Sequence, residues 1–241
     1  MKLLQLFVIT VAIGFVSCQK NSNPTPNPTH NPPPATTLNI VILGSSSAAG
    51  DGANPIDSSW ARRLPATVNK DQVKANFTNL AFGGYTTYEA MPTGYHAASR
   101  PAPDTARNIT KALSYKPALV MLSFPTNDIA ANYSDDEILA NYAKITHVLD
   151  SAKVKYIIFS TQPRDFATAT QRLRLKTLND KIISAYTIHV NDFLDQLSNA
   201  DYTIKTIYSA GDGIHVNNAG HAVIYTATMK QPIFTQLLGL K

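Results

Sequence analysis

Short apolar runs alternate with amphipathic segments along most of this chain, and that alternation restricts its fold more than any other sequence feature. Apolar runs of strand length occur at 38–43, 75–82, 118–124 and 154–161, with a shorter one at 187–190. Helical patterns occur at 60–68, 106–115, 134–153 and 169–186, and in the C-terminal segment with a break at Pro232. Ser134 and Glu137 have the spacing of a capping box, which marks one helix start.

This order of elements predicts an α/β fold, a three-layer α/β/α sandwich with a mainly parallel five-stranded sheet and helices on both faces. Right-handed crossovers place the carboxyl ends of all parallel strands at one edge of the sheet. Ligands bind at that edge in open α/β sheets, so residues that follow the strands are candidates for a site. One domain, residues 38–241, accommodates every predicted element.

The N-terminal segment reads as an export signal rather than as part of the domain. Residues 1–17 contain one early lysine and a long apolar stretch that ends at the small Ser17. The following "FVSC" resembles the lipobox of bacterial lipoproteins, which implies cleavage before Cys18 and lipidation of that cysteine. The alternative is an ordinary signal cleaved nearby, with Cys18 incidental. Cys18 is the only cysteine, so no disulfide or cysteine metal site is expected in the domain.

Residues 18–37 are predicted to be a lipidated cysteine followed by a tether. Six prolines and several Asn and Thr residues lie in this segment, a composition that favours extended, solvated chain. The formal net charge of the whole chain is +5, but the basic residues are scattered and form no stripe with aromatic residues. Nucleic-acid binding is therefore not expected.

The segment "GSSSAAG" at 44–50 follows the first predicted strand directly. It does not have the pattern of a phosphate-binding loop, since no G-K-[ST] follows, and it is not a dinucleotide fingerprint. It is also not a G-x-S-x-G nucleophile elbow, because Ala48 stands at the last position. Taken alone, a serine-rich turn is the simplest interpretation.

Other predicted strand ends favour a chemical role. "NLAFGGYTT" follows the second strand, "FPTND" the third, and "DGIHVNNAGH" lies near the C-terminus. Together these segments offer a serine, glycine backbone, an asparagine, and an aspartate with a histidine. Acyl transfer needs these parts: a nucleophile, donors for the oxyanion, a base, and a carboxylate that orients the base.

With these blocks in this order, the chain resembles the SGNH (GDSL) hydrolase superfamily from Gly44 to His215. Block one is usually G-D-S-x-x-x-G, and Gly44 with Gly50 aligns Ser45 to the Asp position and Ser46 to the nucleophile. The remaining matches are Asn79 and Gly84 in block two, Asn127 and Asp128 in block three, and Asp212 and His215 in block four. Ala81 and Pro125 replace glycines that are usual in blocks two and three.

The resemblance implies a flavodoxin-like three-layer fold and a catalytic triad of Ser46, His215 and Asp212. Ser46 would be the nucleophile, because a serine hydroxyl becomes reactive beside a base such as histidine. Asp212 would orient His215. The oxyanion hole would consist of the Ser46 and Gly84 N–H groups and the Asn127 amide. No metal and no cofactor are expected.

The long connection at 83–104 is the candidate substrate loop. Tyr85, Tyr95, His96 and Arg100 are candidate substrate contacts, and solvated loop residues are the alternative. His221 is expected to be structural and Trp60 to lie in the core. Asp192 and Asp201 compete with Asp212 for the triad, but neither stands three residues before His215.

These observations predict an exported serine esterase, anchored by lipid at Cys18 to a bacterial membrane on its periplasmic or cell-surface face. Its expected substrates are short-acyl, chiefly acetyl, esters of carbohydrates, and it is expected to be a monomer. Three alternatives stay open: an acylhydrolase of the lysophospholipase or arylesterase type, a sugar O-acyltransferase, and a non-catalytic glycan-binding lipoprotein.

Overall fold

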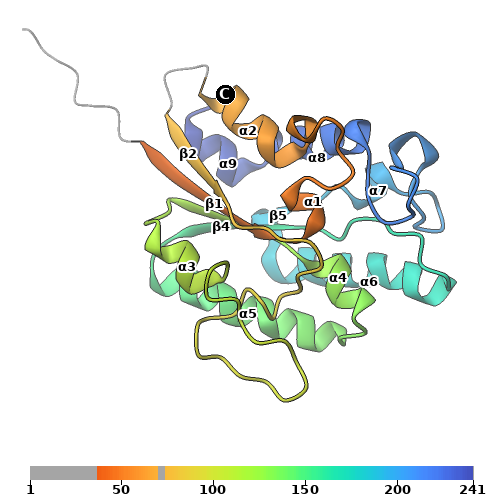
Figure 1. Cartoon of the computed structure of the whole chain (residues 1–241), viewed down its shortest axis with the longest axis horizontal. Coiled ribbons are helices and arrows are strands. Elements are labelled where there is room, and N and C mark those ends of the chain that lie inside the picture. The colour runs from red at the N-terminus through yellow and green to blue at the C-terminus, as the bar shows by residue number, and fades with distance from the viewer. Residues whose placement is uncertain (1–36, 70–73, 241) are drawn as a thin grey trace, which may run out of the picture. The chain divides into compact units, whose positions relative to one another are not determined.

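The computed structural model describes residues 37–69 and 74–240 of the chain. Its centre is a sheet of five parallel strands in the order β2-β1-β3-β4-β5, between two layers of helices (Figure 1). The strands are β1 (Leu38–Gly44), β2 (Ala75–Asn79), β3 (Leu119–Ser123), β4 (Lys155–Phe159) and β5 (Val190–Asn191). The predicted α/β fold is confirmed.

The central strand β1 builds both halves of the core. Side chains alternate across a strand, so Val41 and Leu43 face one helical layer while Ile40 and Ile42 face the other. All four are fully buried. A strand buried on both faces reads as a continuous apolar run, which explains the sequence of this segment.

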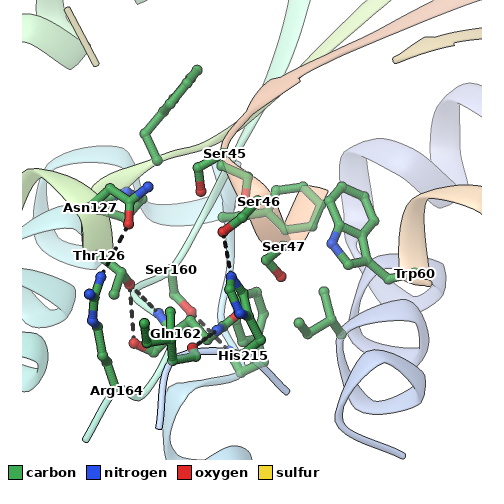
Figure 2. Close-up of a pocket in the computed structure, with 17 residues that line it drawn as sticks. Ser45, Ser46, Ser47, Trp60, Thr126, Asn127, Ser160, Gln162, Arg164 and His215 are labelled. Atoms are coloured by element: carbon green, nitrogen blue, oxygen red, sulfur yellow. Dashed lines mark hydrogen bonds between the residues drawn. The ribbon is translucent and has the colours of Figure 1, made fainter. Parts of the chain in front are cut away.

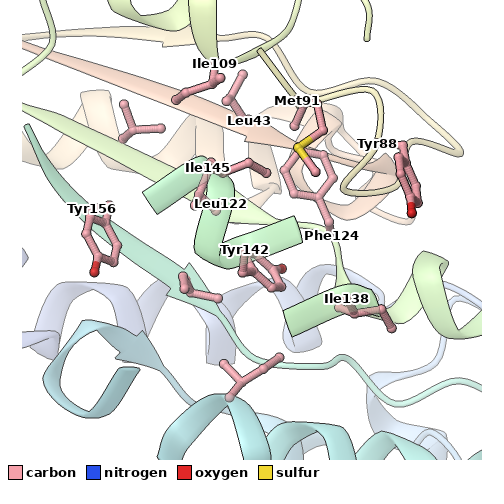
Figure 3. Packing of buried hydrophobic residues seen from close by; sticks show 14 of the residues in the cluster. Leu43, Tyr88, Met91, Ile109, Leu122, Phe124, Ile138, Tyr142, Ile145 and Tyr156 are labelled. Atoms are coloured by element: carbon pink, nitrogen blue, oxygen red, sulfur yellow. The ribbon is translucent and has the colours of Figure 1, made fainter. Parts of the chain in front are cut away.

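The layer that packs on Val41 and Leu43 contains α3 (Ile109–Ser114), α5 (Asp135–Ser151) and α6 (Ala169–Tyr186). Figure 3 shows Ile138, Tyr142 and Ile145 of α5 directed toward this core. The capping box is confirmed, because the Ser134 hydroxyl accepts from the Glu137 N–H and the Glu137 carboxylate accepts from the Ser134 N–H.

The opposite layer contains α2 (Trp60–Val68), α8 (Asn218–Lys230) and α9 (Pro232–Leu238). Trp60 is fully buried there, as expected. Helix α2 begins after Ser59, which occupies the N-terminal cap position. Pro232 occupies the first turn of α9, which explains why the C-terminal segment breaks into two helices.

The fifth strand differs from its prediction. Residues Thr187–His189 form a 3-10 turn (η2), and the strand is confined to Val190–Asn191. The structure also contains elements that the sequence pattern did not predict: the short helices α1 (Ser46–Ala49), α4 (Pro125–Ala130) and α7 (Leu194–Leu197), and the 3-10 turns η1 (Ile56–Ser58) and η3 (Thr206–Tyr208). Helices of one or two turns are too short to show a hydrophobic period.

The predicted signal peptide, Cys18 and all but the last residue of the tether lie outside the described residues. Within residues 37–69 and 74–240, no helix is both long enough and apolar enough to cross a membrane.

Candidate active site

The carboxyl end of β1 leads directly into the serine segment, and close packing there requires Gly44. A Cβ at Gly44 would lie 2.7 Å from the Ala48 Cβ and 2.9 Å from the Ser123 carbonyl oxygen, so any side chain would clash. The Ser45 N–H donates to the same Ser123 carbonyl at 3.0 Å, which ties the turn to β3. Ser46 is therefore the first residue of α1, at the edge of the sheet where ligands bind.

Three side chains from distant segments meet at this edge. The Nε2 atom of His215 lies 2.9 Å from the Ser46 Oγ, and the Nδ1 atom lies 2.6 Å from the Asp212 Oδ2. Figure 2 shows the His215 ring below Ser46, with its Nε2 directed at the hydroxyl. The structure thus brings together the three residues predicted as the triad.

The hydrogen-bond partners determine the tautomer of His215. An ionised carboxylate accepts only, so the proton on Nδ1 points to Asp212. The neutral ring then leaves Nε2 as an acceptor, to which the Ser46 hydroxyl donates. This polarity is the one required for a base that removes the serine proton.

Asp212 is held ionised by its neighbours. Partial burial acts to raise its pKa, but the His215 N–H, the His215 ring and the Ile214 N–H together lower the pKa of Asp212 to about 2. Its Oδ1 accepts both backbone N–H groups at 2.8 Å. The D-x-x-H turn therefore places Asp212 beside His215, and its backbone N–H groups also hold the carboxylate in position.

Asn79, the asparagine of the second block, connects the end of β2 to the helix that carries Ser46. Its Nδ2 donates to the Ala48 carbonyl at 2.7 Å, and its Oδ1 accepts from the Ala81 N–H at 3.0 Å. The first contact links the end of β2 to the helix that carries Ser46. Ala81 replaces the usual glycine without disturbing these hydrogen bonds, because only its backbone N–H takes part in them.

Gly84 does not line the pocket beside Ser46, whereas its neighbour Gly83 approaches the nucleophile closely. A Cβ at Gly83 would lie 4.0 Å from the Ser46 Cβ and 3.6 Å from the Asp51 Oδ2. Gly84 has a φ of +83°, which favours glycine, and open space around it. The loop of the second block therefore lies next to Ser46, and the role of Gly84 as an oxyanion donor stays a prediction.

Asn127 lies in the first turn of α4, with its side chain in a determined orientation. Pro125 occupies the first helical position, where its missing N–H removes no helical hydrogen bond. The Asn127 Nδ2 donates to the Tyr85 carbonyl at 3.2 Å, and its Oδ1 accepts from the Arg164 Nη1 at 3.4 Å. A carbonyl only accepts and a guanidinium only donates, so a single orientation of the Asn127 amide satisfies both contacts.

Asp128, next to Asn127, ties α4 to the loop of the second block. The fully buried carboxylate accepts from the Thr87 N–H at 3.1 Å and from the Thr87 hydroxyl at 2.5 Å. Burial raises the pKa of Asp128 to about 7, although the Thr87 hydrogen bonds act in the opposite direction. Asn141 of α5 also donates to the Thr87 hydroxyl, so the pair is held from a third element.

The four predicted substrate contacts in 83–104 do not line the pocket around Ser46. Arg100 forms an ion pair with Glu137 at 2.5 Å, and this bond is the chief reason that the pKa of Glu137 falls to about 2. Tyr85 donates to Asp104 at 2.5 Å, and burial together with that bond raises the pKa of Tyr85 to about 12.

The other two candidates also lie away from the nucleophile. Tyr95 packs near Tyr88, whose hydroxyl bonds Glu137, and His96 is exposed. Most of these side chains therefore support the loop internally. As substrate contacts, all four stay predictions.

The pocket beside Ser46 includes residues that the sequence analysis missed. The segment after β4 supplies Ser160, Gln162 and Arg164, which Figure 2 shows on the wall opposite Trp60. Ligands bind at the carboxyl ends of parallel strands, so the "TQPR" segment that follows β4 was identifiable as a candidate in the same way as the other strand ends. The cavity in this pocket measures about 30 Å³.

His221 and the rival aspartates have other partners. The buried His221 ring contacts the Trp60 N–H at 3.4 Å and the Asp51 carbonyl at 3.0 Å, and burial lowers the pKa of His221 to about 4. Its interpretation as structural fits these contacts. Asp192 accepts from Asn179, while Asp201 pairs with Arg172 and Thr203. Among the described residues, Asp212 is the carboxylate that contacts His215.

No cluster of three or more His, Cys, Asp or Glu side chains suited to a metal occurs in residues 37–69 and 74–240.

A serine, a histidine and an aspartate aligned at the carboxyl edge of a parallel sheet define a hydrolase of the serine-triad class. A family model described as the GDSL-like Lipase/Acylhydrolase family matches residues 42–223. The chain belongs to this family and is an ester-bond hydrolase, which confirms the resemblance drawn from the four blocks. The comparison with curated proteins gives no match.

Solved structures share the fold at low sequence identity. The psychrotrophic esterase EstA from Pseudoalteromonas sp. is 16% identical with a TM-score of 0.60, covering 83% of this chain and 98% of its own. A lipase/acylhydrolase from Enterococcus faecalis is 17% identical with a TM-score of 0.60, covering 84% and 96%. A GDSL-like lipase from Bacteroides thetaiotaomicron is 18% identical with a TM-score of 0.57, covering 83% and 87%.

Proposed function

We propose that this protein is a serine esterase that removes short acyl groups, chiefly acetyl, from carbohydrates through an acyl-enzyme. The observation that carries the esterase chemistry is the continuous Ser46–His215–Asp212 hydrogen-bond chain. Family membership supports ester hydrolysis. The small pocket and the polar substrate loop support the choice of acyl group and alcohol.

In this mechanism the Ser46 Oγ attacks the ester carbonyl while His215 Nε2 takes the hydroxyl proton. The tetrahedral oxyanion accepts from the Ser46 and Gly84 N–H groups and from the Asn127 Nδ2 hydrogen that Tyr85 leaves free. His215 then returns its proton to the departing alcohol, and an acyl-serine remains. Water, deprotonated by the same ring, releases the acid and regenerates Ser46.

The acyl preference rests on volume. A cavity of about 30 Å³ beside Ser46 is small, which supports a short acyl group over a long alkyl chain. The loop at 83–104 forms turns and bends without a helix, so it offers no apolar lid over the site.

We expect kcat/KM to fall as the acyl chain lengthens from acetyl toward dodecanoyl. Each further methylene would gain about 0.8 kcal/mol only if an apolar surface were available to bury it. The measurement is kcat/KM for p-nitrophenyl esters from C2 to C12. A rise beyond C6 would contradict the acetyl preference and favour the lysophospholipase alternative.

The export proposal rests on sequence alone, on the apolar leader, the "FVSC" segment and the proline-rich tether. We expect Cys18→Ser to release the protein from the membrane fraction without changing its esterase kinetics, because the tether separates the anchor from the domain. Fractionation followed by an ester assay tests both parts. If the variant stays in the membrane fraction, the lipobox interpretation fails.

Two alternatives are separated by product analysis. With an acetylated donor and an added sugar acceptor, an esterase forms free acetate, whereas an O-acyltransferase forms an acetylated acceptor. A non-catalytic glycan-binding lipoprotein would form neither free acetate nor an acetylated acceptor. The intact hydrogen-bond chain at Ser46 favours a catalyst, because carbohydrate binding alone does not require a base-activated serine.

A further inference from the structure

Arg164 is a cation in the pocket of the nucleophile, and no carboxylate of the described residues lies within ion-pair distance of it. Among residues 37–69 and 74–240, five arginines have a carboxylate within 4 Å: Arg62, Arg100, Arg107, Arg172 and Arg174. Arg63 donates to the Asn218 carbonyl, away from Ser46. Arg164 has no such ion pair in the described part of the chain, and it lines the pocket that contains Ser46 and His215.

The backbone around Arg164 is held in place from both sides. Gln162 exchanges hydrogen bonds with Thr126 of α4 and donates its side-chain amide to the Ile214 carbonyl at 3.0 Å. The Asp165 N–H donates to the Gly213 carbonyl at 2.9 Å. These contacts connect the segment to the Asn127 helix and to the His215 turn, so the side chain is presented from a rigid base.

The Arg164 guanidinium makes few hydrogen bonds. It lies over the Phe166 ring, with 5.1 Å from Cζ to the ring centre, and one nitrogen reaches the Asn127 Oδ1 at 3.4 Å (Figure 2). A guanidinium carries five N–H donors, so most of them are available. Asp212 is the charged group that acts on it, but Asp212 directs its oxygens at the His215 turn.

Partial burial makes this arrangement costly without a ligand. Burial lowers the pKa of Arg164, which reflects the removal of water from the charged group. Buried charges are normally paired, because desolvation is otherwise uncompensated. A fixed, partly buried and unpaired guanidinium in a cleft is therefore suited to receive a negative group from outside.

We propose that Arg164 is a specificity-determining residue that binds an anionic group on the ester substrate. The anion is a carboxylate on an acylated sugar or a phosphate on an acylated polyol, both of which match the donor geometry of a guanidinium. This inference rests on the proposed function, since it assigns the charge of the substrate at the same site.

The experiment compares matched neutral and anionic acetyl esters. One pair is an O-acetylated methyl glucoside and the corresponding glucuronide, and the other is acetylglycerol and acetylglycerol phosphate. We expect the wild type to prefer the anionic member of one pair. Arg164→Gln should lower the anionic-to-neutral ratio of kcat/KM by about 10- to 100-fold, as for loss of a charged hydrogen bond, and Arg164→Lys by less.

Arg62→Gln is the matched control, because it removes the same charge from an exposed arginine that pairs with Asp57. It should leave the ratio unchanged, which excludes a general effect of net charge. A second measurement needs no variant: methyl glucuronide or glycerol phosphate should inhibit wild-type hydrolysis of the neutral ester, whereas methyl glucoside and glycerol should not.

The outcomes are distinct. A preference in the glucuronide pair identifies a carboxylate, and a preference in the glycerol pair identifies a phosphate. The proposal is overturned if the wild type shows no anionic preference, or if Arg164→Gln lowers both members of each pair equally, which is the result for a residue that only positions Asn127. Failure of the proposed function looks different, since wild-type protein would then hydrolyse none of the esters.

Discussion

Replacing Ser46 with alanine is expected to reduce ester hydrolysis to background, a loss of about 10⁶-fold in kcat on the scale of other serine triads. The Ser46 hydroxyl is the group that His215 can deprotonate, since its Oγ lies 2.9 Å from Nε2. Alanine keeps the short helix α1 and removes only that oxygen. The measurement is kcat for p-nitrophenyl acetate, with the fold checked by circular dichroism.

Ser45→Ala and Ser47→Ala are the matched controls, because they remove hydroxyls one residue on either side. Of the three neighbouring serines, only Ser46 bonds the His215 ring, so both controls should keep most of the activity. A fluorophosphonate probe followed by peptide mapping gives an independent readout. Labelling at Ser45 or Ser47 instead of Ser46 would refute the assignment of the nucleophile.

The second large effect is expected at the base and its carboxylate. His215→Ala should cost several orders of magnitude in kcat, and Asp212→Asn about 10⁴-fold. An asparagine amide would place a donor opposite the Nδ1 proton, so the ring would adopt the tautomer that carries its proton on Nε2. In that tautomer the ring cannot accept the proton of Ser46.

Because the pKa of Asp212 is about 2, its carboxylate stays ionised across the usual assay range, and a pH change there does not imitate the asparagine variant. Asp192→Asn is the control, since Asp192 accepts from Asn179 and does not contact His215. A larger loss from Asp192→Asn than from Asp212→Asn would show that the wrong carboxylate has been assigned. Both kcat and KM should be measured, because a loss confined to the transition state leaves KM little changed.

The layers of this fold could be predicted because their signals are local. The buried strands β1 and β3 read as unbroken apolar runs, and α6 spans the residues, 169–186, that its helical period indicated. Hydrophobic period reflects burial on one face, and long elements repeat it often enough to be recognised. The two-residue strand β5 and the one-turn helix α1 were misplaced or missed because they are shorter than one clear repeat.

Much of the candidate triad could also be predicted, because its parts have close sequence relations. Asp212 and His215 share a turn, and the resemblance of the Gly44–Gly50 segment to the family's first block selects Ser46 among three serines. The packing explains one of these signals: a Cβ at Gly44 would collide with β3, so glycine is required there.

By itself the sequence determined the order of strands and helices, the edge of the sheet where chemistry occurs, and the residue types for a serine hydrolase. Tertiary structure alone decided which polar groups meet. Arg100, a candidate for substrate contact, pairs with Glu137, whereas Arg164 lines the pocket and donates to Asn127, with no ion pair in the part of the chain that the structure describes. The physical reason is that each of these contacts joins residues 37 positions apart in the chain. Which partner an arginine finds therefore depends on how the elements pack, and no local sequence pattern reveals it.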